Sequence, residues 1–402
     1  MTARPARLGY LVSHPIQYQA PLLKRISEEA DIDLTVLFCS DVSLREFADP
    51  EFGTAFSWDV PLLEGYRHEF LPSLGDAARL SFWEPFNYGI SAALKRLQLD
   101  ALWIHGWGYF SHLWAARIAR SSGIRVLLRG ESSLHLSGKG FVKQTLKDWF
   151  LRNTISGADA LLAIGSLNRD FYLHYGAPSN RVFLMPYAVD NDFFQRRCSL
   201  ASQGREQLRD ELQLVRGRPV ILYASKMTAR KRARDLLEAY IRLSPDGTTP
   251  PDAYLLLIGD GEERLLLEAI VQDLGWNTVR FLGFKNQTEL PAYFDLCDVF
   301  VLPSFNEPWA LVVNEAMNAG RAVIVSDQVG CAPDLVRHGE NGFIFKAGDV
   351  QALSQALMQC LGDSQLTRQM GERSRKIVEG WGFEQDVAGL RCALASFGLV
   401  KA

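Results

Sequence analysis

Short apolar runs alternate along the whole chain with longer segments whose apolar positions recur at helical spacing. Apolar runs of about 4–8 residues are typical of strands buried on both faces of a parallel sheet. In the first half, the predicted strands are residues 8–13, 33–39, 101–106, 124–130, 160–165 and 181–186. In the second half, they are residues 219–225, 253–259, 279–283, 299–304, 322–327 and 342–345. This alternation predicts an α/β protein with doubly wound parallel sheets.

The length of 402 residues is typical of two domains. We predict a first domain over residues 1–195 and a second over 218–380, because residues 190–217 are polar and lack a strong strand pattern. The predicted linker is 196–217, and residues 381–402 are expected to form a helix that crosses back to the first domain. Between residues 40 and 85 the pattern is too poor to predict a topology.

Composition narrows the class of protein. Hydrophobic residues make up 48% of the chain and charged residues 22%, and the formal net charge is −3, so no global field favours nucleic acid. The six cysteines include no CxxC pair, which favours a reducing compartment over disulfides or a zinc site. No apolar stretch approaches the roughly 18–20 residues that span a bilayer, and the N-terminal apolar run is too short for a signal peptide. We therefore expect a cytoplasmic protein, with peripheral contact to the inner face of a membrane left open.

Two carboxylates, Glu307 and Glu315, carry the most specific signal. They follow the predicted strand 299–304, and Pro308 favours an extended Glu307 placed just before a helix. Glu315 then lies roughly 9 Å along that helix. The backbone N–H groups that the helix leaves without partners, and that attract phosphate, are those of Trp309, Ala310 and Leu311. Two carboxylates around a phosphate site are the layout that a nucleotide-sugar pocket needs.

Several segments occur in an order that resembles a known family. They are YASKMTARKRARDLLEAY (223–240), LLLIGDGEE (255–263), VRFLGF (279–284), the span from Glu307 to Glu315, and VGCAPDLVRHGENGFIF (329–345). In these segments the chain resembles retaining glycosyltransferases of the GT-B fold, in particular glycosyltransferase family 4. The resemblance is strong over residues 160–380 and weaker before them. It implies two Rossmann-like domains that face each other across a cleft.

The resemblance assigns the donor diphosphate to Lys226 and Lys231, with Lys226 standing where arginine is common. Two ammonium groups and a helix N-terminus can stabilise a nucleotide leaving group, so no metal and no cofactor are expected. A solvated basic loop is the alternative, since Arg230 and Arg232 flank Lys231.

Further donor contacts are implied in the same way. Glu315 is expected to accept hydrogen bonds from the ribose hydroxyls, and Glu307 to contact the donor sugar. A helix-dipole carboxylate is the alternative, and it suits Glu307 but not Glu315. Ala310 replaces the glycine usual in the family, which leaves less room beside the sugar. The remaining candidates on this side are Gly259 for close approach of the nucleotide, Phe284 for the base or for core packing, and Asn306 for the cleft.

Polar residues also lie at strand ends of the first domain, where open α/β sheets bind ligands. Glu131 and His105 are candidate catalytic residues, and His14 and Arg129 are candidates for the donor-sugar or acceptor cleft. The alternatives are a structural histidine at 105 and an ion pair of Glu131 with Arg129 or another nearby arginine. Relatives often carry a glycine-rich loop at the position of His14, and this chain does not.

The expected reaction transfers a sugar, with retention of configuration, from a nucleotide-diphosphate donor to a hydroxyl of a glycan, glycolipid or lipid-linked saccharide in cell-surface polysaccharide biosynthesis. The resemblance implies no protein nucleophile. In the segment 139–153, Lys139, Lys143 and Lys147 form one helical stripe beside aromatic residues. Such a helix fits an anionic membrane, or else presents a solvated cationic face.

Three other functions fit parts of the chain. A metal-dependent transferase would use a DxD motif, which Asp31–Asp33 and Asp190–Asp192 match as strings. A sugar-nucleotide epimerase of similar two-domain shape would act on the donor alone. A non-catalytic subunit would bind a nucleotide sugar without turnover.

Overall fold

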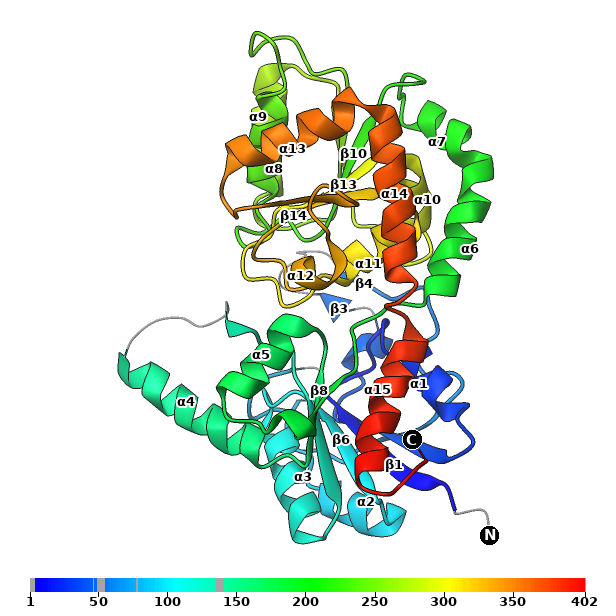
Figure 1. Ribbon diagram of the computed structural model, residues 1–402, viewed down its shortest axis with the longest axis vertical. Coiled ribbons are helices and arrows are strands. Elements are labelled where there is room, and N and C mark those ends of the chain that lie inside the picture. The colour runs from blue at the N-terminus through cyan, green and yellow to red at the C-terminus, as the bar shows by residue number, and fades with distance from the viewer. Residues whose placement is uncertain (1–3, 46, 49–54, 77–78, 135–140, 402) are drawn as a thin grey trace. The chain divides into compact units, whose positions relative to one another are not determined.

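The computed structural model describes residues 4–45, 47–48, 55–76, 79–134 and 141–401 (Figure 1). The chain divides into two compact units. The first contains Met1–Phe47, Val60–Ala188 and Gly382–Ala402, and the second contains Ala48–Asp59 and Val189–Trp381. Each unit is built on its own parallel sheet.

The first sheet has the strand order β5-β2-β1-β6-β7-β8-β9. Its strands are β1 (Ala6–Val12), β2 (Ile32–Phe38), β5 (Arg67–Phe70), β6 (Ala101–His105), β7 (Arg125–Arg129), β8 (Ala160–Ala163) and β9 (Val182–Leu184). Two shorter strands, β3 (Phe47–Ala48) and β4 (Ala55–Phe56), pair with each other. Strand β5 lies at the edge of the sheet, within residues 40–85, where we predicted no strand. Its sequence, RHEF, is polar and partly exposed, so no apolar run indicated it.

Helices cover both faces of the first sheet. They are α1 (Ala20–Ser27), α2 (Ile90–Leu97), α3 (Phe110–Ser121), α4 (Phe141–Ser156), α5 (Ser166–His174) and α15 (Phe383–Ser396). Alternation along β1 explains the two cores. Leu8 and Tyr10 belong to the core that contains side chains of α1 and α15, whereas Leu11 belongs to the core that contains side chains of α2 to α5.

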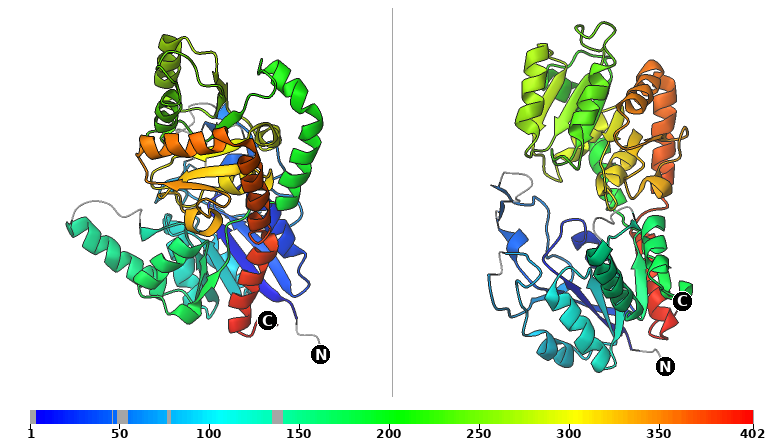
Figure 2. Two further views of the ribbon diagram at one scale, coloured as in Figure 1. Left: turned by 45° about the horizontal axis from the view of Figure 1, so that its top comes forward. Right: turned by 90° about the vertical axis from the view of Figure 1, so that its left-hand side faces the viewer.

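The second sheet has the order β12-β11-β10-β13-β14-β15. Figure 2 shows the second unit in two further views, with its chain coloured mainly from green through yellow to orange. Its strands are β10 (Val220–Ala224), β11 (Tyr254–Ile258), β12 (Val279–Gly283), β13 (Val299–Leu302), β14 (Ala322–Ser326) and β15 (Gly342–Phe345). The helices of this unit are α6 (Asn191–Ala201), α7 (Arg205–Glu211), α8 (Ala233–Ile241), α9 (Arg264–Leu274), α10 (Leu290–Leu296), α11 (Leu311–Asn318), α12 (Ala332–Leu335), α13 (Val350–Gly362) and α14 (Ser364–Val378). The predicted α/β class with parallel sheets is confirmed in both units.

The segment 196–217, which we predicted as a linker, is mostly helical and belongs to the second unit. Asp190 caps α6 by accepting a hydrogen bond from the backbone N–H of Phe193 at 2.8 Å. Arg205, at the start of α7, pairs with the buried Asp295 of α10 at 2.8 Å. The sequence of the segment resembles a linker because charged side chains, and not an apolar run, hold it to the second unit.

The C-terminal helix α15 belongs to the first unit (Figure 1). Its Asp386 pairs with Arg129 of β7 at 3.0 Å, and both side chains are only 1% exposed. The chain therefore returns to its first unit and is held there by a buried ion pair.

Candidate functional site

Both sheets have a switch point. This is the strand at which the chain, after adding strands on one side, crosses over and adds the next strands on the other side. In the second sheet this strand is β10, which lies between β11 and β13. Ligands of open α/β sheets bind outside the carboxyl ends of the strands at such a point. Lys226 follows β10 and Glu307 follows β13, so the topology brings the two candidate segments to the same edge.

Glu307 lies in a cluster of opposite charges. Its Oε2 accepts hydrogen bonds from Lys231 Nζ and from Arg230 Nη1, the latter at 3.3 Å, and the residue is 8% exposed. Its backbone is fixed by the N–H of Glu307, which donates to Gln328 at 3.0 Å, and by the N–H of Gly330, which donates to the carbonyl of Glu307 at 2.9 Å. Two cations on one oxygen make this carboxylate an electrostatic anchor.

Lys231 is nearly buried beside this carboxylate, with 12% of its side chain exposed. Burial lowers the pKa of Lys231; Glu307 opposes the shift, and the nearby charges of Arg230 and Lys226 add to it. The Tyr223 hydroxyl donates to the backbone carbonyl of Lys226 at 2.7 Å, which fixes the loop that follows β10. Lys226, Arg230 and Lys231 therefore lie close to one another after β10, and their binding of the donor diphosphate stays a prediction.

The turn before α11 has a constrained backbone. Ala310 has φ 81° and ψ 72°, in the left-handed region, and α11 begins at Leu311. This conformation suits glycine, which explains physically why a glycine is usual there and why Ala310 is strained. Asn306 is also left-handed, with φ 51°, and its carbonyl accepts from Arg230 at 3.4 Å. Trp309 is buried, and its indole donates to Asn314 Oδ1 at 3.0 Å.

Glu315 lines a cavity of about 150 Å³ in the second unit. The cavity also contacts Gly259 and Phe284, so three residues predicted to bind the nucleotide meet in one place. Burial raises the pKa of Glu315 to about 7, and a hydrogen bond with Gln287 opposes the shift. Gly259, with φ 123°, is required here because an added Cβ would lie 2.0 Å from the carbonyl oxygen of Ser225.

In the first unit, His105 and Glu131 come together with residues that the sequence did not single out. His105 Nε2 lies 3.4 Å from Glu131 Oε1, and the hydroxyl of Tyr187 donates to the same oxygen. Tyr18 also donates to it at 3.3 Å, and Gln19 Nε2 lies 3.2 Å from His105 Nε2. The residues that sequence reasoning missed here are Tyr18, Gln19 and Tyr187. The segment HPIQYQ after β1 is a polar strand end that could have indicated the first two.

The charge state of this cluster follows from its contacts. Burial raises the pKa of Glu131, but hydrogen bonds with His105 and Tyr187 outweigh it and hold the pKa below the usual range. Burial lowers the pKa of His14 to about 4, and the charge of His105 adds to the shift, so His14 is neutral near pH 7. His14 Nδ1 lies 2.9 Å from the hydroxyl of Ser13.

Arg129 differs from its predicted position in a cleft. Its guanidinium is buried, donates to the carbonyl of Met185 at 2.8 Å and pairs with Asp386. It also lies over the ring of Tyr187, 4.6 Å from the centroid. The buried Arg129 therefore packs against the ring of Tyr187. Among the described contacts, no ion pair joins Arg129 to Glu131.

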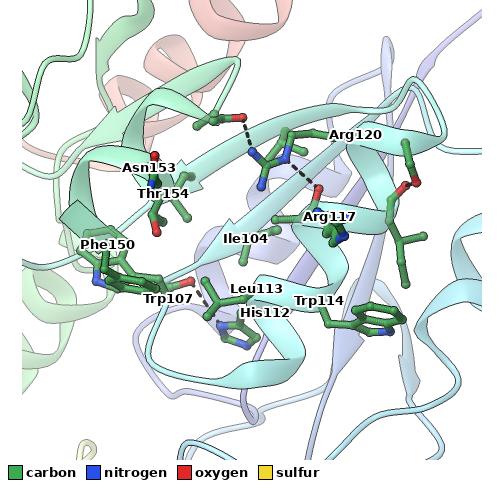
Figure 3. A pocket seen from close by; sticks show the side chains of 18 of the residues that line it. Ile104, Trp107, His112, Leu113, Trp114, Arg117, Arg120, Phe150, Asn153 and Thr154 are labelled. Carbon is green, nitrogen blue, oxygen red and sulfur yellow. Dashed lines mark hydrogen bonds between the residues drawn. The ribbon is translucent and has the colours of Figure 1, made fainter. Parts of the chain in front are cut away.

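A second, larger cavity of about 930 Å³ lies between α3 and α4 in the first unit (Figure 3). Its walls are mostly apolar and aromatic, and they include Trp107, Trp114 and Phe150. Arg120 stands at its edge and donates to the carbonyls of Ala116 at 3.1 Å and Gly157 at 3.2 Å.

The two DxD strings have structural contacts. Asp31 pairs with Arg391, Asp33 pairs with Arg67 at 2.8 Å, and Asp190 caps α6. In the part of the chain that the structure describes, no group of three or more potential ligands is arranged to hold a metal ion. Within those same residues, no helix combines the length and apolar character needed to cross a bilayer.

The chain matches two sequence families. Residues 204–377 match glycosyl transferases group 1, and residues 30–188 match the glycosyl transferase 4-like domain. The relatives include the N-acetyl-alpha-D-glucosaminyl L-malate synthase of Bacillus anthracis, 33% identical over 43% of this chain and 44% of the relative. They also include a GDP-mannose-dependent phosphatidylinositol monomannoside mannosyltransferase of Mycobacterium tuberculosis, 28% identical over 65% of this chain and 66% of the relative. The chain thus aligns with between about half and two thirds of these relatives' length.

Solved structures share the fold over nearly the whole chain. Anabaena HepE in complex with UDP and glucose has a TM-score of 0.70 at 20% identity, covering 97% of this chain and 100% of that one. The sucrose-phosphate synthase of Thermosynechococcus elongatus has a TM-score of 0.73 at 18% identity, covering 98% and 99%. Both likenesses place the two α/β units in the GT-B fold.

Proposed function

Because the chain belongs to the GT-B glycosyltransferases of the family 4 type, we propose that it transfers a sugar from a nucleoside-diphosphate sugar to a hydroxyl group of a saccharide or lipid-linked acceptor. The observation that carries the proposal is the meeting of Lys231, Arg230 and Glu307 at the switch point of the second sheet. Support also comes from HepE, whose structure holds UDP and glucose, and from relatives named for sugar transfer. We place the product in cell-surface polysaccharide or glycolipid synthesis.

In the proposed mechanism, the bond between the sugar's anomeric carbon and the phosphate oxygen breaks while the acceptor oxygen attacks the same face. The departing phosphate oxygen takes the proton of the acceptor hydroxyl. Configuration is retained because the acceptor oxygen bonds to the face that the phosphate leaves. The leaving diphosphate gains negative charge, which Lys226, Lys231 and the N-terminus of α11 stabilise. This stabilisation needs no metal ion.

Glu307 orients the donor in this mechanism and is not a nucleophile. A retaining glycosidase uses a carboxylate nucleophile about 5 Å from a second carboxyl group. The carboxylate of Glu307 instead shares one oxygen between Lys231 and Arg230, which reduces its nucleophilicity. It can hold sugar hydroxyls while it keeps Lys231 in place for the diphosphate.

The acceptor is assigned to the first unit. Glu131 and His105 share hydrogen bonds with Tyr187 at the carboxyl ends of β6 and β7. We propose that this cluster positions the attacking hydroxyl, with Glu131 ionised, as its lowered pKa favours.

Turnover with a chelator present tests the proposal. Release of nucleoside diphosphate from a sugar donor, in excess chelator and with acceptor, should equal the rate without chelator. The Glu307→Ala variant should lose turnover by about 10²-fold or more, as expected for removal of one preorganised electrostatic group. Loss of all activity in chelator would contradict the metal-independent mechanism, and a product formed from donor alone would favour an epimerase.

A membrane contact at residues 139–153 is proposed for a lipid-linked acceptor. Lys139 lies outside the described residues, and Phe141 and Lys143 begin α4, where the structure describes the backbone only. Further along α4, Leu146 is 65% and Trp149 67% exposed, which suits an interfacial helix. Co-sedimentation with anionic liposomes at low salt is expected, and absence of binding there would remove this part of the proposal.

A further inference from the structure

Trp58 comes from the first half of the sequence but lines the cavity that contains Glu315. The stretch that contains it, Ala48–Asp59, is part of the second unit, although the chain before and after it belongs to the first. We infer that Trp58 stacks on the nucleobase of the bound nucleotide and so contributes to donor recognition. The inference rests on the proposed function.

The position of Trp58 is fixed by hydrogen bonds on both sides of it. The Asn286 side chain donates to the carbonyl of Ser57 at 2.7 Å. The backbone N–H of Thr288 donates to Asp59 Oδ2 at 3.1 Å, and the Thr288 hydroxyl donates to the same oxygen. Trp58 is therefore held against the loop that follows β12 by its two neighbours in sequence.

The same loop reaches the carboxylate assigned to the ribose. Gln287, between the two anchoring residues, hydrogen bonds with Glu315 and lines the cavity. One short segment, residues 286–288, thus fixes the positions of Trp58 and Glu315 relative to each other. A ribose held at Glu315 leaves its base to lie within the remaining walls of this cavity.

Those walls suit an aromatic ring. Phe284 and Trp58 supply aromatic surface, and Leu290 and Ile258 supply aliphatic surface. The cavity, about 150 Å³, is smaller than the roughly 300–1,000 Å³ of pockets for whole drug-sized ligands, so it fits one part of a nucleotide. Stacking on an aromatic side chain is available to every base, because every base has a π face. A tryptophan offers a large rigid surface for it.

Calorimetric titration of the full chain with UDP, GDP and ADP tests this role. For each nucleotide that the wild type binds, Trp58→Ala should raise Kd about tenfold or more, and Trp58→Phe should stay within about threefold, since a ring remains. Inorganic pyrophosphate, which has no base, should bind Trp58→Ala as it binds the wild type. The matched control is Trp83→Ala, which removes an exposed tryptophan of the first unit and should leave every Kd unchanged.

A second variant separates position from presence. Thr288→Val removes the hydroxyl contact with Asp59 while Trp58 stays, and we expect a smaller rise in nucleotide Kd and unchanged pyrophosphate binding. Wild-type affinity in Trp58→Ala would overturn the inference, as would an equal loss of nucleotide and pyrophosphate affinity. If the wild type binds none of the three nucleotides, the proposed function itself fails and this role falls with it.

Discussion

Glu307 and Glu315 are two carboxylates in one short segment with opposite surroundings. Glu307 is paired with Lys231 and Arg230, whereas Glu315 is buried in a cavity beside the neutral Gln287. Burial without a cation raises the pKa of Glu315 to about 7. A buried carboxylate without a cation destabilises the folded state near neutral pH, and such a position is typical of a functional site.

Replacement of Glu315 by glutamine should stabilise the ligand-free protein and weaken nucleotide binding. The raised pKa means that the folded state holds the proton more tightly than the unfolded chain. The contribution of the protonated Glu315 to the free energy of unfolding is fully present below about pH 4.5 and is lost as the pH rises through about 7. At about 1.4 kcal/mol per pKa unit, Glu315→Gln should gain up to about 3 kcal/mol at pH 8. Equilibrium unfolding by denaturant at pH 5 and pH 8 measures the change in the free energy of unfolding that Glu315→Gln causes. An equal change at both pH values would contradict the prediction.

Ala310 gives a second prediction at this scale. Its φ of 81° is strained for alanine, so Ala310→Gly should stabilise the second unit by about 0.5–1 kcal/mol despite the entropy of glycine. The matched control is Ala352→Gly inside α13, where the same exchange should destabilise by about 0.5–1 kcal/mol. Thermal denaturation compares the two, and the same sign for both would refute the strain at Ala310.

At the scale of elements, the buried strands could be predicted from the sequence because each is an apolar run between polar segments. Strand β5 could not, because an edge strand with the sequence RHEF has no such run. Helices α6 and α7 resembled a linker, since their contacts are made by charged side chains such as Arg205. Lys231 and Glu307 could be predicted because each lies in a recognisable motif after a buried strand, β10 or β13. Trp58 could not, because it lies in an irregular segment of the first half of the chain. Tyr187 follows the short strand β9 but stands in no motif that indicated a role.

The pair of Arg129 and Asp386 should hold α15 on the first unit. Removal of one partner leaves a buried charge without compensation, so Arg129→Ala should destabilise by about 3–5 kcal/mol. The control is Arg67→Ala, which breaks the exposed pair with Asp33 and should cost less than about 1 kcal/mol. Equilibrium unfolding followed by tryptophan fluorescence measures both, and similar costs would contradict the role given to the buried pair.

At the scale of the whole molecule, each unit carries its polar residues at the carboxyl ends of its own parallel sheet. The second unit gathers cations and carboxylates suited to a nucleoside diphosphate, and the first gathers His105, Glu131 and Tyr187. We propose that side chains in irregular segments of the chain determine which donor and which acceptor bind. These segments carry no periodic pattern, which is why the sequence predicted the class of reaction but not its substrates.

The most direct test of the central claim is a thermal-shift titration of the wild type and Lys231→Ala with UDP-, GDP- and ADP-sugars. At least one donor, at a concentration about 100 times its Kd, should stabilise the wild type by about 2.7 kcal/mol. Lys231→Ala should need at least about tenfold more of that donor, because one charge-assisted hydrogen bond contributes roughly 1.5–3 kcal/mol. No stabilisation by any of these donors, or equal stabilisation of the variant, would contradict a nucleotide-sugar site at Lys231 and Glu307.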